Sequence, residues 1–360
     1  MKGTKYFLYI FSVLLVTWSC QRDDDEPRKA RKPISRLYVS TSDYNPSSGD
    51  AQLRNIFVID PADSTDFTTQ GALRYDSGAK GGGVLHFSAF ARSVFHASVN
   101  TPAYEDTTIR VQSVNDKGQL ASVGNIGNRK FDRVRGLWYH NIDNLDQLLI
   151  ANPGDDTVSV FVVDKPRRYN GFARYAFQVM LEDRIWGMQL DSTHLMLSKT
   201  GADGGILVFR DFVNEVNRRR DTLVEDIRPT YRLTVSGSKN IRGFFYAKAS
   251  DILVLSDYES SGVGAKILVF EKFSQYKADA TIQPTRVISG ASTLLQEPLS
   301  VTVDGKENPK YIYVSDAGAR KVFRFKLEDS GDVAPDKEMT LGNNQTPQAI
   351  FLDSRGVNEY

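Results

Sequence analysis

The chain has 360 residues, of which 41% are hydrophobic and 11% aromatic, and its formal net charge is +1. This length holds one large domain or two ordinary ones. The small net charge excludes a general electrostatic attraction to nucleic acid, so no nucleic-acid partner is expected. The abundance of Val, Ile, Tyr and Phe favours β-strands.

Residues 1–19 are typical of a secretory signal peptide. Lys2 and Lys5 precede the apolar run 6–16, which ends shortly before Cys20. The run is shorter than the ~20 apolar residues that a membrane-spanning helix needs. A cleaved signal is therefore favoured over a transmembrane anchor.

Cys20 is the only cysteine of the chain, so no intramolecular disulfide can form. The segment from Leu14 to Cys20 resembles the lipobox of bacterial lipoproteins, although Trp18 stands where that family has a small residue. The resemblance implies that Cys20 becomes the lipidated first residue of the mature protein, whose acyl chains attach it stably to a membrane. The alternative is a free thiol inside an unusual signal peptide.

Residues 20–33 are predicted to form a flexible tether, because they are charged, contain proline and have little to bury. Their acidic run, Asp23–Glu26, resembles the surface-export signal of lipoproteins in Bacteroidetes-type bacteria. That resemblance implies a lipid-anchored protein of the outer membrane, displayed on the cell surface or facing the periplasm. Residues 34–360 remain for the folded domain.

A repeated unit organises residues 34–360. The segments Gly205–Phe212 and Lys266–Phe273 align, and so do the apolar runs that follow them. The unit holds four short strands in about fifty residues, a period typical of propellers. First strands are predicted at Val84–Ser88, Val134–Tyr139, Ile185–Leu190, Ile241–Tyr246, Pro298–Val303 and Pro347–Leu352. Second strands are predicted at Ser93–Ser98, Gln147–Ala151, His194–Ser198, Asp251–Ser256, Lys310–Ser315 and Arg36–Ser40.

The two ends of the chain supply complementary parts of one unit. The N-terminal part has the second, third and fourth strands, at Leu37–Ser40, Asn55–Asp60 and Ala72–Tyr75, and the C-terminal part has only the first, at Pro347–Leu352. Joined, they close a ring and remove its free edges. The sequence therefore predicts an all-β, six-bladed β-propeller with four-stranded antiparallel blades, one of them shared by both termini. An insertion at Asp211–Glu225 could form a short helix.

One stretch resembles the NHL and YVTN-type propeller repeats, including those of bacterial surface lipoproteins. It consists of Leu295–Asp304, Tyr311–Asp316 and Lys321–Phe325. The resemblance implies the propeller fold. It leaves the function open, because propellers include binding proteins and enzymes alike.

Motifs of catalysis and metal binding are not recognisable in the sequence. The four histidines, His86, His96, His140 and His194, lack the spacing of a zinc site and are interpreted as satisfied structural or surface residues. There is no nucleophile elbow, HExxH motif or P-loop. We therefore predict no catalytic residue, metal or cofactor.

Asp and Gly residues recur at the ends of second strands. Asn152, Asp257 and Asp316 occupy one position of the repeat, which favours a shared role in a turn. Asp155-Asp156 and Gly201–Gly205 are interpreted as hairpin turns, with a calcium site as the alternative.

The first strands of a propeller surround its axis, so small residues there let the backbones approach. Such residues stand at equivalent places, namely Gly136, Gly187, Gly243, Ser300 and Ala349. The large residues beside them are the candidates for ligand binding in the central channel: Arg135, Trp186, Arg242, Glu297 and Gln348. Two arginines and a tryptophan would suit an anionic or sugar-like ligand. Alternatively, these side chains plug the channel and pair with one another.

Three functions are compatible with these patterns. The favoured one is a non-catalytic surface or envelope lipoprotein whose propeller binds a protein, a glycan or a small ligand, because no catalytic constellation is recognisable. The second is a propeller-type hydrolase or lyase resembling the six-bladed lactonases, which hold calcium with Glu, Asn and Asp at the channel; only Glu297 is a carboxylate here. The third is a structural scaffold in an envelope complex.

Overall fold

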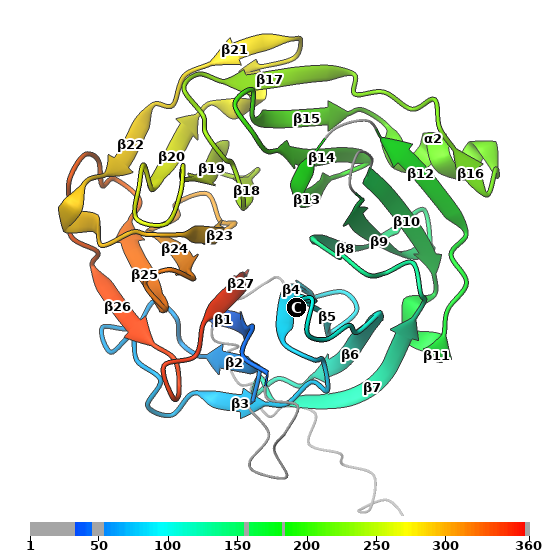
Figure 1. Ribbon diagram of the computed structural model, residues 1–360, viewed down its shortest axis with the longest axis horizontal. Coiled ribbons are helices and arrows are strands. Elements are labelled where there is room, and N and C mark those ends of the chain that lie inside the picture. The colour runs from blue at the N-terminus through cyan, green and yellow to red at the C-terminus, as the bar shows by residue number, and fades with distance from the viewer. Residues whose placement is uncertain (1–32, 45–53, 155–157, 182–183, 357–360) are drawn as a thin grey trace, which may run out of the picture.

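The computed structural model describes residues 33–44, 54–154, 158–181 and 184–356. These residues form a ring of six β-sheets around a central axis (Figure 1), and the predicted all-β, six-bladed propeller is confirmed. The first strand of each blade lies nearest the axis and the fourth lies at the circumference. In the described residues no helix is both long and apolar enough to span a bilayer. The predicted signal peptide (1–19) and most of the tether (20–33), including Cys20, lie outside the described residues.

The blades follow the chain in order, apart from the one that joins its ends. Blade 1 is β27 (Pro347–Arg355), β1 (Ile34–Thr41), β2 (Ile56–Ile59) and β3 (Leu73–Tyr75). Blade 2 is β4 (Gly82–Ser88), β5 (Ser93–Ser98), β6 (Thr108–Val114) and β7 (Leu120–Gly127), and blade 3 is β8 (Gly136–Ile142), β9 (Leu145–Pro153), β10 (Val158–Asp164) and β12 (Phe177–Leu181). Blade 4 is β13 (Ile185–Asp191), β14 (His194–Lys199), β15 (Gly205–Phe209) and β17 (Tyr231–Val235). Blade 5 is β18 (Phe244–Ala247), β19 (Ile252–Asp257), β20 (Lys266–Glu271) and β22 (Arg286–Ser289), and blade 6 is β23 (Pro298–Val303), β24 (Tyr311–Asp316), β25 (Lys321–Lys326) and β26 (Lys337–Thr340).

Three blades carry a fifth strand that the sequence did not predict. β11 (Asn170–Phe172), β16 (Leu223–Val224) and β21 (Ala280–Ile282) each leave the connection before a fourth strand and pair in parallel with the outer strand of the preceding blade. Pairing of this kind covers an outer edge that would otherwise expose its backbone groups. The insertion in blade 4 also contains helix α2 (Phe212–Arg219), inside the segment where a short helix was expected.

The core lies between neighbouring blades. Middle strands such as β10 and β15 are buried along nearly their whole length, because each blade packs on both faces against another sheet. Near the axis the sheets approach so closely that small residues are required. A Cβ atom on Gly136 would lie 2.6 Å from Cβ of Met188, and one on Gly243 would lie 2.6 Å from Cα of Ser300.

The termini close the ring as predicted. β1 pairs antiparallel with β27, from Ile34 opposite Arg355 to Val39 opposite Ile350. Hydrogen bonds between strands from opposite ends of the chain therefore join the last blade to the first, and no free sheet edge is left between them.

Two buried arginines hold blade 1 to its neighbours, and the sequence did not predict this role. Arg36 on β1 donates from Nε to Asp60 Oδ2 at 2.8 Å and from Nη2 to the carbonyl of Asp116, in the turn before β7 of blade 2, at 3.0 Å. Arg324 on β25 of blade 6 donates from Nη1 to the carbonyls of Ala62 and Ser64, in the β2–β3 loop of blade 1, at 3.0 and 2.7 Å. A guanidinium therefore bridges each interface of the closing blade.

Candidate functional site

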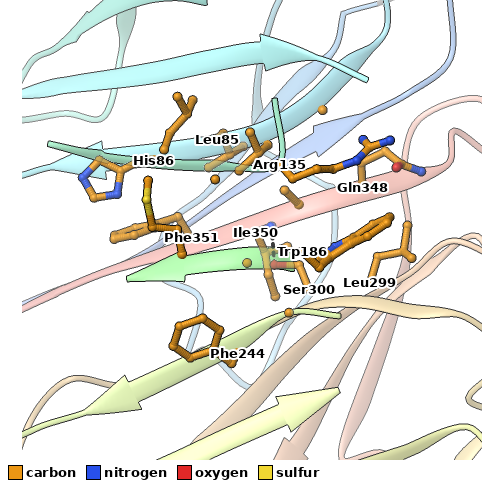
Figure 2. Close-up of a pocket in the computed structure, with 18 of the residues that line it drawn as sticks. Leu85, His86, Arg135, Trp186, Phe244, Leu299, Ser300, Gln348, Ile350 and Phe351 are labelled. Carbon is orange, nitrogen blue, oxygen red and sulfur yellow. Dashed lines mark hydrogen bonds between the residues drawn. The ribbon is translucent and has the colours of Figure 1, made fainter. Parts of the chain in front are cut away.

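A cavity of about 100 Å³ lies on the axis of the ring and is lined by the innermost segments of all six blades (Figure 2). Where β13, β23 and β27 enter it, each strand is irregular in its pairing with its neighbour. Such bulges re-aim side chains and are frequent beside functional sites. Here the irregular positions include Trp186, Leu299 and Gln348, all of which line the cavity.

Two guanidinium groups and one indole ring stand at the rim of the cavity. The Cζ atom of Arg242 lies 4.0 Å from the centre of the Trp186 ring, and that of Arg135 lies 4.8 Å from it. Arg242 is also held by Tyr258, whose ring centre is 5.4 Å away, and by a hydrogen bond of 3.1 Å from Nη1 to Thr200 Oγ1. Cation–π contacts hold both arginines against the same indole ring.

The rim carries positive charge, and no carboxylate in the described residues is paired to it. Burial lowers the pKa of the Arg135 guanidinium, and the nearby charges of Arg242 and Arg133 lower it further. Within the described part of the chain, neither Arg135 nor Arg242 forms an ion pair with a carboxylate. The two cations therefore face the same ring and repel each other, an arrangement that an anion placed near both would relieve.

Aromatic rings close the other end of the cavity. The centre of the His86 ring lies 4.7 Å from that of Trp138 and 4.9 Å from that of Phe351, and Phe245 lies 6.5 Å from Phe351. These four residues come from the first strands of four different blades. They give the cavity an apolar floor with one polar member, His86.

His86 is buried without a hydrogen-bond partner. His86 is only 3% exposed, and neither ring nitrogen has a hydrogen-bond partner among the residues that the structure describes. Burial lowers the pKa of His86 to about 3, so its imidazole is neutral at pH 7. His86 was interpreted from the sequence as a satisfied residue, but no described protein group satisfies either of its ring nitrogens.

The other histidines have local roles. His96 Nδ1 lies 2.7 Å from Ser77 Oγ, His140 Nδ1 accepts a weak hydrogen bond of 3.4 Å from the backbone of Ile142, and His194 Nδ1 accepts one of 3.0 Å from the backbone of Asp211. Their structural interpretation is supported, although His96 and His140 each retain one unpartnered nitrogen.

The sequence-based candidates divide into three groups. Arg135, Trp186 and Gln348 line the cavity, and Arg242 lies at its rim through its contact with Trp186. Glu297 is not part of the lining. Leu299, which stands directly before the small Ser300, takes that place, whereas Glu297 stands three residues before Ser300.

Side chains at the ends of the second strands position the rim arginines. Asn152 Oδ1 accepts a hydrogen bond of 2.8 Å from the backbone of Arg133, and Asp257 Oδ1 accepts one of 2.5 Å from that of Asn240, in each case two residues before a rim arginine. Asp316 accepts bonds from the backbone of Gln296 and Glu297 in the same way. The three residues therefore share one structural role, but the bonds described here hold the segment before the first strand, whereas a role in a turn was predicted.

A serine hydroxyl adds a contact that sequence reasoning missed. Ser198 on β14 donates to the carbonyl of Arg242 at 2.8 Å and accepts from the backbone of Gly187 at 2.7 Å. One hydroxyl thereby ties the first strands of blades 4 and 5 together beneath Trp186 and Arg242. The recurrence of serine at the end of the predicted second strands was the signal that could have revealed it.

The described residues contain no group of three or more His, Cys, Asp or Glu side chains placed to hold a metal ion. Gly201–Gly205 forms a turn, with the backbone of Gly204 bonded to the carbonyl of Gly201 at 3.0 Å. Asp155-Asp156 lies outside the described residues.

Comparison with known proteins identifies the fold of the chain but no family to which it belongs. No family model matches the chain, and no curated protein matches its sequence. Among solved structures it is similar to the periplasmic gluconolactonase of Pseudomonas aeruginosa, with 13% identity and a TM-score of 0.51 over 90% of this chain and 100% of that one. It also matches the WD40 β-propeller domain of Doa1 (8% identity, TM-score 0.40, 70% of this chain and 66% of that one) and hydrazine synthase of Kuenenia stuttgartiensis (12%, 0.42, 68% and 76%). At these identities the likeness shows the fold alone, which is that of a β-propeller.

Proposed function

We propose that this chain is a non-catalytic, lipid-anchored envelope protein whose propeller binds an anionic group of its ligand at the rim of the central cavity. The observation that carries the proposal is the convergence of Arg135 and Arg242 on Trp186, with no carboxylate paired to either arginine in the described residues. Guanidinium groups recognise carboxylates and phosphates through paired, charge-assisted hydrogen bonds.

The size of the cavity limits what enters it. About 100 Å³ is small beside the roughly 300–1,000 Å³ typical of pockets that enclose a drug-sized molecule. A small acid would fit inside. A larger ligand, such as a glycan or a protein, would insert only one acidic group and lie over the face of the ring around the rim. Both occupants use the same two arginines, so one set of variants tests them together.

The proposal includes the localisation of the protein at the outer membrane. Cys20 would carry the acyl chains, and the charged residues 20–33 would hold the propeller away from the outer membrane. Metabolic labelling with a fatty-acid analogue, followed by membrane fractionation, tests this. We expect the label and the membrane association to be lost together in Cys20→Ala. Retention of the label in that variant would contradict the proposed lipidation site.

Variants of the rim test the binding role. Small carboxylates are titrated into the full-length protein in detergent, with Arg135→Gln and Arg242→Gln as test variants and Arg218→Gln, on the exposed surface of α2, as the charge-matched control. Losing a charge-assisted hydrogen bond worth about 1.5–3 kcal/mol weakens binding roughly tenfold to a hundredfold. Equal affinity in the wild type and both rim variants would refute the rim as the site.

The hydrolase alternative makes a different prediction. A propeller of the lactonase type would contain calcium and open a lactone. Stoichiometric calcium in the purified protein, together with lactone hydrolysis, would overturn the non-catalytic proposal and favour this alternative.

A further inference from the structure

The cavity has a second polar feature, at the end opposite the arginines. We propose that its ligand is a small hydroxylated carboxylic acid, bound with the carboxylate at Arg135 and Arg242 and with a hydroxyl group hydrogen-bonded to His86 at the floor. The carboxylate end rests on the proposed function. The hydroxyl end rests on the independent geometry of His86 and its aromatic neighbours.

His86 lacks the partners that buried polar groups normally have. An unsatisfied buried donor or acceptor costs about 1–3 kcal/mol, and native proteins rarely leave one without a reason. Both ring nitrogens of His86 are in this state, on a residue that lines the cavity. A neutral imidazole offers one donor and one acceptor, and a hydroxyl group can satisfy either of them.

The surroundings of His86 favour an organic ligand over a water molecule. A buried water typically makes about three hydrogen bonds to polar groups. Here the rings of Trp138 and Phe351 pack against His86, Phe245 packs against Phe351, and Leu85 also lines the cavity. A water would find few partners there. A ligand would place its carbon atoms against the rings and direct its hydroxyl to the imidazole.

The charges of the two ends differ, which makes the ligand asymmetric. The rim is cationic, whereas burial keeps His86 neutral at pH 7 because its pKa lies at about 3. A second carboxylate at the floor would be buried against aromatic rings without a counter-charge, at a large desolvation cost. The site therefore favours one carboxylate at the rim and an uncharged, hydroxyl-bearing far end.

The distance between the two ends sets the size of the ligand. Arg135, directly before β8, marks the rim level, and Trp138, three residues further along the chain, marks the floor level, about 10 Å away at ~3.3 Å per residue. Side chains reach into this space from both ends. Within this length and the volume of about 100 Å³, we propose a ligand no larger than one six-membered ring with its substituents. A sugar acid of one ring combines this length with a carboxylate at one end and hydroxyl groups at the other.

Four probes test the proposal by calorimetric titration of the full-length protein in detergent. Glucuronate has both ends, cyclohexanecarboxylate lacks the hydroxyls, glucose lacks the carboxylate, and glucarate has a second carboxylate. We expect glucuronate to bind about tenfold more tightly than cyclohexanecarboxylate or glucarate, the value for one good hydrogen bond, and glucose to bind more weakly still. This ranking is measured on the wild type and needs no variant to fold.

Variants of His86 provide the second test. His86→Phe should lower the affinity for glucuronate to that for cyclohexanecarboxylate and leave the latter unchanged, whereas His86→Gln, which keeps a donor and an acceptor, should restore part of the difference. His140→Phe is the matched control, because His140 also has a buried, unpartnered Nε2 but does not line the cavity. Thermal unfolding of each variant establishes that it is folded.

The two proposals fail in different ways. If glucuronate and cyclohexanecarboxylate bind equally well and His86→Phe changes neither, the inference about the floor is overturned, while weaker binding in Arg135→Gln still supports the rim. If none of the three carboxylates binds, or if all bind Arg135→Gln and Arg242→Gln as well as they bind the wild type, the rim proposal fails and the floor proposal fails with it.

Discussion

Arg36 links three segments that meet where the ring closes, and its removal should destabilise the whole propeller. Its guanidinium bonds to Asp60 and to the carbonyl of Asp116, and it lies 3.9 Å from Asp353 on β27. We propose Arg36→Met as the perturbation, because Met fills a similar volume with an unbranched, adaptable side chain. The variant therefore removes the charge and the hydrogen bonds while limiting the loss of packing.

The expected loss of stability in Arg36→Met depends on how exposed the carboxylates of Asp60 and Asp353 are. Removing one member of a buried ion pair costs about 3–5 kcal/mol when the other is left uncompensated. Here the Asp60 side chain is 36% exposed and can be solvated, and Asp353 keeps a second partner in Arg355, whose Nε lies 2.8 Å from Oδ1. We therefore expect the free energy of unfolding to fall by about 2–3 kcal/mol, somewhat below that range.

A neighbouring arginine provides the control. Arg92 pairs with Asp116, in the turn that Arg36 also contacts, but both members of this pair are exposed, Arg92 at 60% and Asp116 at 86%. Arg92→Met should change the free energy of unfolding by less than about 0.5 kcal/mol. Urea denaturation followed by tryptophan fluorescence measures both variants. If Arg36→Met lowers stability no more than Arg92→Met does, buried bridging across the closing blade does not stabilise the ring as argued.

Two further predictions concern the closing strand and acid. Deleting the residues after Thr346 removes β27 and exposes Leu37 and Val39, so the domain should no longer unfold cooperatively. Deleting residues 21–31 is the control and should leave the unfolding midpoint unchanged. A folded protein without β27 would refute closure of the ring as a source of stability. Burial lowers the pKa of His86 and His96 to about 3 and that of His140 to about 4, below the ordinary value of about 6.5, so the unfolded chain binds more protons as the pH falls. The contribution of these three histidines to the free energy of unfolding is complete above pH ~6.5 and is lost towards pH 4, at up to about 4 kcal/mol per pH unit. Burial raises the pKa of Asp316 and of Asp353, and this offsets part of the loss at low pH. Urea midpoints at pH 5, 6 and 7 should show this slope, and His86→Phe should reduce it by about a third; an unchanged slope would contradict the assignment of His86 as a neutral buried group.

The chemistry of the rim was accessible from the sequence because it repeats with the blades. Arg135, Trp186 and Gln348 stand directly before small residues at one position of the unit, and the first strand that follows this position lies nearest the axis. Glu297 does not follow this pattern, because it stands three residues before the small Ser300. Leu299 stands directly before Ser300, as Arg135, Trp186 and Gln348 stand before their small neighbours, and it lines the cavity.

The sequence by itself determined the architecture: the repeat predicted six blades, and the incomplete units at its two ends predicted closure by strands from both termini. These features are local patterns, in which alternating and continuous apolar runs record which faces are buried. The tertiary structure alone decided which polar groups are enclosed. In the sequence, Arg36, Arg324 and His86 look like ordinary residues of predicted strands. They are buried because segments far apart in the chain pack around them. The partners of a buried charge or an unpaired imidazole depend on how blades pack against one another, and that packing leaves no period in the sequence.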